Sequence, residues 1–220
     1  MIRRLPIVLT LALLCSHVAA QTDTVAVSDT VKTILMRDVF ANMPQKILPL
    51  VTKNNRLDCI DFIENNMEAR VRNAIDDYVV LEALTSDYLR FRTSNSSYIE
   101  MKLLQEDARF IIAFGRTVEL GHCFDSHITF YSLDWQALNS DERFTAPDID
   151  AFLPLTPTDD VQRQAMLALR DYHPMCISFS QSEPLIECAL QTTDLSTEQS
   201  TSIADDLRTV TLRWNGQRFE

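Results

Sequence analysis

Apolar and polar side chains alternate in two neighbouring stretches near the middle of the chain, and this alternation predicts a β-hairpin. Residues 88–92 and 98–103 place an apolar side chain at every second position, which is the period of a strand with one buried face. A turn centred near Ser96 pairs Phe91 with Met101 on that face. The same register places charged side chains on the opposite face, which we expect to be exposed to solvent: Arg90 and Arg92 opposite Glu100 and Lys102.

More strands are predicted after this hairpin, because the two-residue period continues. They are expected at residues 109–114, 118–124 and 127–133, with turn residues at 115–116 and 125–126 between them. Strands joined by short turns pair with their sequence neighbours. This part of the chain is therefore predicted to form an antiparallel meander.

A three- and four-residue spacing of apolar side chains before the strands predicts an amphipathic helix that begins near Asn54 and Asn55. This spacing places four apolar side chains on one helical face: Leu57, Ile60, Ile63 and Met67. Such a stripe must be buried against another layer, and the predicted sheet can supply that layer.

The order of helix and strands recurs after a connector at residues 139–158, which contains three prolines and little periodicity. Asp159 or Asp160 can cap the next helix, because a short side-chain oxygen accepts a bond from a free N–H of the first turn. Asn215-Gly216 predicts the turn of a final hairpin. The expected elements are a helix at 161–172, strands at 175–180 and 185–191, a short helix at 197–207, and a hairpin at 210–219.

These patterns predict an α+β fold with helices packed on one face of an antiparallel sheet. Two helix-then-strands units are an alternative topology for the same elements. The predicted organisation is a signal peptide at 1–20, a flexible leader at 21–33, helices and meander at 34–138, the connector at 139–158, and a helix with C-terminal strands at 159–220.

The first twenty residues have the order of a secretory signal peptide. Arg3 and Arg4 precede an apolar stretch, and small residues end at Ala20, where we expect cleavage. Lipidation at Cys15 is the alternative, although Leu14 is larger than the residue that a lipoprotein signal has before its cysteine. No later stretch approaches the roughly 20 apolar residues of a transmembrane helix. An exported protein of the periplasm or cell surface is therefore predicted.

The charge of the chain argues against several classes of partner. Loss of Arg3 and Arg4 with the signal peptide would change the formal net charge from −11 to −13. Such a surface repels nucleic acid and anionic lipid, which are bound through Lys and Arg. Only three glycines occur, and phosphate-binding loops and nucleophile elbows depend on glycine. We expect no nucleic-acid partner and no cofactor.

Residues with reactive or metal-binding side chains form no recognisable motif. His122, Cys123 and His127 could be read as metal ligands, but their spacing lacks a fourth ligand and fits polar strand residues equally. With His173 they are also the histidines available to a hydrolase, for which the usual nucleophile motifs are absent. We predict no metal site and name no catalytic residue.

Four cysteines remain after the predicted cleavage. Cys176 and Cys188 lie symmetrically about Ser182, so a hairpin centred there would bring them within reach of a cross-strand disulfide. Cys59 and Cys123 are interpreted as buried thiols.

One region of the chain resembles a known family. The residues that carry the resemblance lie at 38–40, 43–44, 48–50, 52–58, 60–62, 67, 84–85, 87–89 and 101–104. They are similar to the domain of unknown function 3256 family, which consists of exported proteins of anaerobic Gram-negative bacteria. The resemblance implies export to the cell envelope and supplies no activity. Its best-matching polar residues, Arg56, Asp58 and Asp61, are either a binding site or the charged start of a helix.

The function expected from these observations is a non-enzymatic binding or accessory module for an envelope protein or glycan. An exposed row of aromatic side chains on an open sheet face would favour it: Tyr78, Tyr88, Tyr98 and Tyr131. The alternatives are an envelope hydrolase of unfamiliar type and a structural or assembly component.

Overall fold

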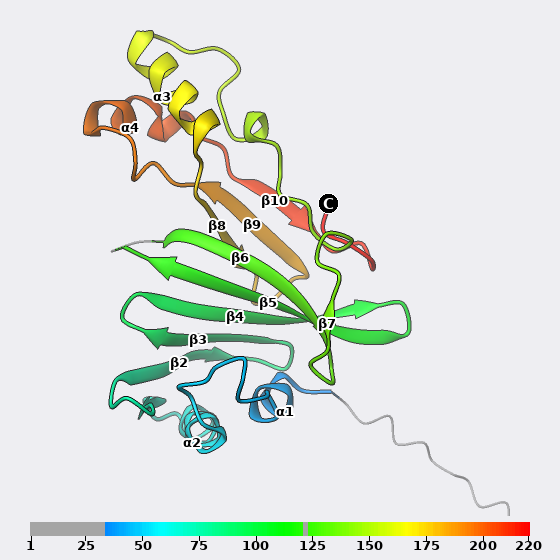
Figure 1. Ribbon diagram of the computed structural model, residues 1–220. Helices are drawn as coiled ribbons and strands as arrows, with labels where there is room; N and C mark the ends of the chain where they lie inside the picture. Colours follow the sequence, from blue (N-terminus) through cyan, green and yellow to red (C-terminus); the bar gives the residue numbers. More distant parts are fainter. Residues whose placement is uncertain (1–33, 121–122) are drawn as a thin grey trace, which may run out of the picture. The chain divides into compact units, whose positions relative to one another are not determined.

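The computed structural model describes residues 34–120 and 123–220 (Figure 1). The predicted signal peptide, the leader and His122 lie outside this part of the chain. The described part confirms an α+β fold, with a seven-stranded antiparallel sheet in the order β1-β2-β3-β4-β5-β6-β7 and a three-stranded sheet in the order β10-β9-β8. None of its helices has the length and apolar character needed to cross a membrane.

Most elements follow the predicted order, and the structure adds strands at Arg70–Arg72, Tyr78–Leu84 and Ala137–Leu138 that the sequence patterns did not predict. The helices are α1 (Met36–Ala41), α2 (Lys53–Glu64), α3 (Asp160–Asp171) and α4 (Thr197–Ile203), with 3₁₀ turns η1 (Ile149–Ala151) and η2 (Ala204–Asp206). The strands of the large sheet are β1 (Arg70–Arg72), β2 (Tyr78–Leu84), β3 (Tyr88–Ser94), β4 (Ser97–Glu106), β5 (Arg109–Glu119), β6 (Cys123–Ser132) and β7 (Ala137–Leu138). Those of the small sheet are β8 (Met175–Phe179), β9 (Leu185–Leu190) and β10 (Val210–Arg213).

The hairpin of β3 and β4 forms where the alternation predicts it, but its register differs by two residues. Phe91 pairs with Ile99, and the strands close over a tight turn in which Ser94 opposes Ser97. The predicted pairing of Phe91 with Met101 is therefore wrong. A shift of two residues keeps each side chain on its face, so Phe91 and Met101 are still buried together.

Two long strands replace the three short ones predicted after the hairpin. Gly115 lies inside β5 and Asp125 inside β6, so neither marks a turn. Gly115 is required by a close approach, since a Cβ at this position would lie 2.6 Å from Cε2 of Phe179 on β8. A strand glycine that admits a neighbouring layer looks like a turn residue in the sequence.

The first face of the large sheet packs against α1 and α2. Thr52 caps α2 reciprocally with Asn55, because each residue accepts the backbone N–H of the other through its side-chain oxygen. The buried side of α2 carries Cys59 and Ile60, whereas Leu57 is 43% exposed. The predicted apolar stripe is therefore rotated, since contacts with β1 and β2 orient the helix.

The second face of the large sheet packs against β8 of the small sheet, and the apolar cluster on this side extends into α3 and the segment before it. Its core includes Phe130 of β6, Ile177 of β8 and Met166 of α3. Glu100 and Lys102, expected on a solvent-exposed face, are only 3% and 1% exposed. That expectation is wrong because β8 covers β4 and β5.

The segment predicted as a connector contributes to this second core. Phe152 and Leu153 are buried, and Arg143 donates to Glu106 Oε1 at 2.8 Å. The following helix is capped by Asp159, whose carboxylate accepts the N–H of Gln162. The predicted division into units at residues 139–158 stays a prediction.

Candidate functional site

The predicted set of Arg56, Asp58 and Asp61 is not brought together. Arg56 is 1% exposed and donates to the carbonyl oxygens of Val51 at 2.8 Å and Met43 at 2.6 Å. Burial lowers the pKa of its guanidinium. Asp58 and Asp61 are exposed on the same helix. The Arg56 side chain therefore fixes the chain between α1 and α2, out of reach of a solvent ligand.

The predicted disulfide between Cys176 and Cys188 is wrong. On β8 and β9 Cys176 opposes Ala189 while Ile177 opposes Cys188, and this one-residue difference puts the two sulfurs on opposite faces. Cys176 instead forms a disulfide with Cys123 at the start of β6, with 6.1 Å between their Cα atoms. Cys123 is thus not a free thiol. The disulfide connects the small sheet to the large sheet.

Cys59 and Cys188 are buried free thiols. Burial raises the pKa of each to about 12, so neither is a nucleophile at neutral pH.

The histidines form no catalytic or metal constellation in residues 34–120 and 123–220. His127 and His173 are both exposed, and His173 Nδ1 lies 3.0 Å from the carbonyl oxygen of Leu169. No group of three His, Cys, Asp or Glu side chains in the same ranges is placed to hold a metal ion.

The buried charges between the two sheets form a closed network. The Tyr88 hydroxyl donates to Glu100 Oε1 at 2.6 Å, and Arg90 lies 3.5 Å from the same carboxylate. Burial raises the pKa of Glu100, and this effect outweighs the lowering of the pKa by Tyr88 and Arg90. Lys102 Nζ donates to the carbonyl oxygen of Gln181 and pairs with Asp87 at 2.9 Å. Glu100 and Lys102 lie beneath β8 and are closed to a substrate, whereas the side chains of Arg90 and Asp87 stay partly exposed at the margin of the network.

The predicted row of exposed tyrosines does not exist. Tyr88 and Tyr98 are 1% and 5% exposed, and Tyr131 packs against the core on the helix side. Tyr78 is exposed, but the guanidinium of Arg70 covers its ring at 3.7 Å. Within the described part of the chain, these four tyrosines therefore do not form an open aromatic row on the sheet.

An open backbone edge exists on β6. The N–H of Ser132 donates to Gln136 in the β7 direction, and alternate residues of an antiparallel strand bond to alternate sides. Ser126 and Ile128 therefore point their N–H and C=O groups the same way as Ser132. Strand β7 pairs only with Phe130 and Tyr131. Within the described residues, no hydrogen-bonding partner reaches the outward backbone groups of Ser126 and Ile128. Ser126 is partly exposed, whereas Ile128 is only 3% exposed beside β8.

The chain leaves this edge because β7 is very short. Trp135 adopts a positive φ of 61° in the turn before β7. After Leu138, Ser140 starts a new turn, in which its carbonyl accepts the N–H groups of Arg143 and Phe144. The segment beyond β7 therefore runs beside β6 without pairing with it.

A pocket of about 430 Å³ lies between this edge, residues 140–146 and β8. That volume is within the usual range for ligand pockets. The apolar part of its lining is Ile128, Phe144, Ala146, Met175 and Ile177, and the polar part is Ser126, His127, Ser140, Asp141 and Thr145. We call the free edge of β6 together with this pocket the β6 slot.

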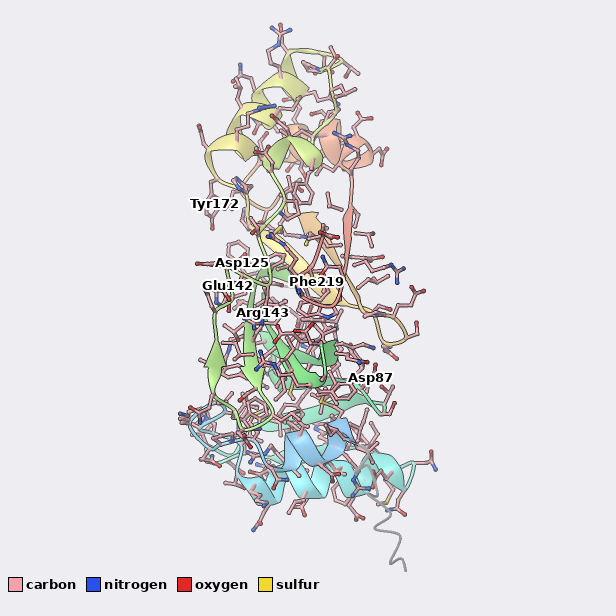
Figure 2. The ribbon with its side chains drawn as sticks, turned by 90° about the vertical axis from the view of Figure 1, so that its right-hand side faces the viewer. Asp87, Asp125, Glu142, Arg143, Tyr172 and Phe219 are labelled. Atoms are coloured by element: carbon pink, nitrogen blue, oxygen red, sulfur yellow. A yellow bond between two sulfur atoms is a disulfide. The ribbon has the colours of Figure 1, made fainter. Side chains whose placement is uncertain are left out.

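Two buried contacts fix the walls of the β6 slot. The Cys123–Cys176 disulfide holds β8 next to β6. Arg143 holds the outer wall, because its guanidinium binds Glu106 of β4 and donates to the carbonyl of Asn139 at 2.8 Å. Figure 2 shows Arg143 with Glu142 and Asp125 along this side of the molecule. A preformed site of this kind loses little entropy on binding.

A second hollow, of about 530 Å³, lies between Asp107 and the turn at Gly216. Its lining is mainly polar, and Trp214 is only 8% exposed with its indole N–H donated to the carbonyl of Gln105. The buried ring offers no stacking platform. The β6 slot combines free backbone groups with an apolar pocket, so it is the better candidate.

The sequence matches a family model described as "Protein of unknown function (DUF3256)" over residues 27–219. The chain belongs to this family. A solved structure of a domain of an uncharacterized protein from Porphyromonas gingivalis W83 is similar to this DUF3256 protein, with a TM-score of 0.68 and 26% sequence identity. The match covers 83% of this chain and 96% of that chain. No curated protein matches. The predicted family is confirmed, and the activity must be argued from the site.

The β6 slot was not predicted from the sequence. Asp125-Ser126 looks like a turn, whereas the strand runs through it from Cys123 to Ser132. The apolar residues at Ile128 and Phe130 continue the strand period across this point, and they were the available signal.

Proposed function

We propose that this DUF3256 protein is a non-enzymatic binding module that holds a protein partner by adding an extended segment of the partner to β6. The observation that carries the proposal is the pair of outward, unpartnered backbone edges at Ser126 and Ile128 beside an apolar pocket. In strand addition, main-chain hydrogen bonds supply affinity and a pocket for an alternate side chain supplies specificity.

The free strand edge favours a polypeptide over the glycan alternative. A polypeptide repeats N–H and C=O groups at the spacing of a strand, whereas a sugar chain does not. Carbohydrate recognition uses exposed aromatic rings. Tyr88, Tyr98 and Trp214 are buried and Arg70 covers Tyr78, so Tyr172, which is 57% exposed, is a single open ring without an aromatic neighbour among the described contacts.

Export to the cell envelope is part of the proposal. The signal-peptide pattern of residues 1–20 supports it. The Cys123–Cys176 disulfide also supports it, because disulfides persist in oxidising compartments outside the cytosol.

A display experiment tests the proposed function. Random heptapeptides displayed on phage are selected on the oxidised protein comprising residues 21–220, and enriched sequences are measured against two variants. Ser126→Pro removes the outward N–H without removing a bond to β5, so it should weaken binding about tenfold or more. Ser126→Ala is the matched control, since it keeps the N–H and should bind like the wild type.

Two results would overturn the proposed function. One is a selection without enriched peptides. The other is a selected peptide that binds a folded Ser126→Pro variant as tightly as the wild type. Binding on a glycan array without peptide binding would support the carbohydrate alternative instead.

A further inference from the structure

Acidic side chains gather at the rim of the β6 slot. Asp141 lines the pocket and Asp125 lies in β6 next to Ser126, and both carboxylates are exposed. Glu142 lies on the same side of the molecule (Figure 2). Among the described residues, no Lys or Arg forms an ion pair with Asp125 or Asp141.

The cations near the slot do not balance these acids. Arg143 is buried and its guanidinium forms an ion pair with Glu106. Arg218 donates to the Thr145 hydroxyl at 3.1 Å. The rim therefore carries a negative charge within a chain whose formal net charge is −11.

The floor of the slot fits an aliphatic side chain. Ile128, Ile177 and Met175 form it together with Phe144. Met adapts its flexible thioether to the shape of a neighbour. Burial of one leucine-sized side chain is favourable by about 1.5–3 kcal/mol, which is roughly tenfold to a hundredfold in affinity.

We propose that the β6 slot binds a cationic extended segment with one aliphatic side chain in the pocket and Lys or Arg at flanking positions. This inference rests on the proposed function and names the chemistry of the partner. A second copy of this chain is a poorer occupant, because pairing two β6 edges would bring Asp125 and Asp141 of both copies together. Like charges placed opposite each other across a pair of strands are destabilising.

Fluorescence anisotropy with four labelled nonapeptides tests the inference. All are unstructured and alternate Thr with the variable positions. The first has a central Leu with flanking Lys, the second replaces Lys by Glu, the third replaces Lys by Gln, and the fourth replaces Leu by Ser. We expect the Lys and Leu peptide to bind about tenfold or more tightly than the Glu peptide at low salt, and the Ser peptide to bind at least about tenfold more weakly.

Protein variants identify the groups responsible. Asp125→Asn with Asp141→Asn should weaken the Lys peptide about threefold to tenfold and flatten its salt dependence, while leaving the Gln peptide unchanged. Ser126→Pro should weaken every peptide that binds.

The outcomes separate the two proposals. Equal, Ser126→Pro-sensitive binding of the Lys, Glu and Gln peptides overturns the cationic partner and retains strand addition. Absence of binding by all four peptides, together with failure of the display selection, overturns strand addition itself.

Discussion

The two edges of the large sheet differ in how they are protected. Strand β1 is only three residues long, and the guanidinium of Arg70 stacks over the ring of Tyr78. The side-chain amide of Asn55 donates to the outward carbonyl of Arg72 at 2.9 Å. On β6, the outward backbone groups of Ser126 and Ile128 have no hydrogen-bonding partner among the described residues, and the exposed charge beside them is Asp125, whose carboxylate accepts the N–H of Met175. Natural proteins protect free edges against unwanted pairing. The unpaired edge beside a pocket is therefore the feature that the proposed strand addition uses.

Removal of the Cys123–Cys176 disulfide, which holds β8 beside β6, should have the largest effect on stability. The bridge spans 53 residues, so replacing both cysteines by Ser should lower the free energy of unfolding by about 4 kcal/mol. Urea unfolding measures this change, and Cys188→Ala is the control without the bridge loss. Thiol counting gives an independent check, because the denatured, unreduced residues 21–220 should expose two thiols. Four thiols would contradict the bridge.

The contact of the small sheet with β5 should give the next largest effect. Gly115→Ala places a methyl group against Phe179, and overpacking of this kind costs about 1–3 kcal/mol. Chemical unfolding measures the loss. Adding Phe179→Leu to Gly115→Ala should recover part of it, and strictly additive effects would contradict the contact.

The buried Glu100 beneath β8 should make the stability of the protein depend on pH. The pKa of Glu100 is raised above its ordinary value of 4.5. The folded state therefore binds the Glu100 proton more tightly, and the resulting stability is present below pH 4.5 and lost as the pH rises through the raised pKa. Glu100→Gln removes this titration. The wild type should lose stability relative to Glu100→Gln between pH 4 and neutrality, and parallel stability curves would contradict the assignment.

Loss of protection at β1 should have the smallest effect on the monomer. Arg70→Thr with Arg72→Thr should change the free energy of unfolding by less than about 0.5 kcal/mol and increase self-association in sedimentation velocity. Arg70→Lys with Arg72→Lys is the charge-preserving control and should stay monomeric. Association of the control to the same extent would show that charge does not protect this edge.

Local sequence patterns predicted where helices and strands lie better than they predicted which other segments pack against them. Alternation identified β3, β4, β8 and β9 because a strand repeats every two residues whatever covers it. The cap at Asp159 and the turn at Gly216, with a φ of 103°, depend on a few neighbouring residues and could also be predicted.

The surroundings could not be predicted because they depend on distant segments. Glu100 and Lys102 alternate like residues of an exposed face, yet β8 covers them from more than 70 positions away. The register of β8 and β9 differs by one residue from the predicted one, so Cys176 does not face Cys188 and instead bonds to Cys123. The β6 slot exists because β7 ends after two residues, and the pattern of apolar and polar residues does not predict that end.

Amide hydrogen exchange of ¹⁵N-labelled protein, with and without the Lys and Leu nonapeptide, tests the open edge most directly. The account predicts alternation along β6, with fast exchange at Ser126 and Ile128 and slow exchange at His127 and Thr129, which bond to β5. Added peptide should slow Ser126 and Ile128 to the rate of their neighbours. Slow exchange at Ser126 and Ile128 without peptide, or unchanged fast exchange with saturating peptide, would contradict strand addition at β6.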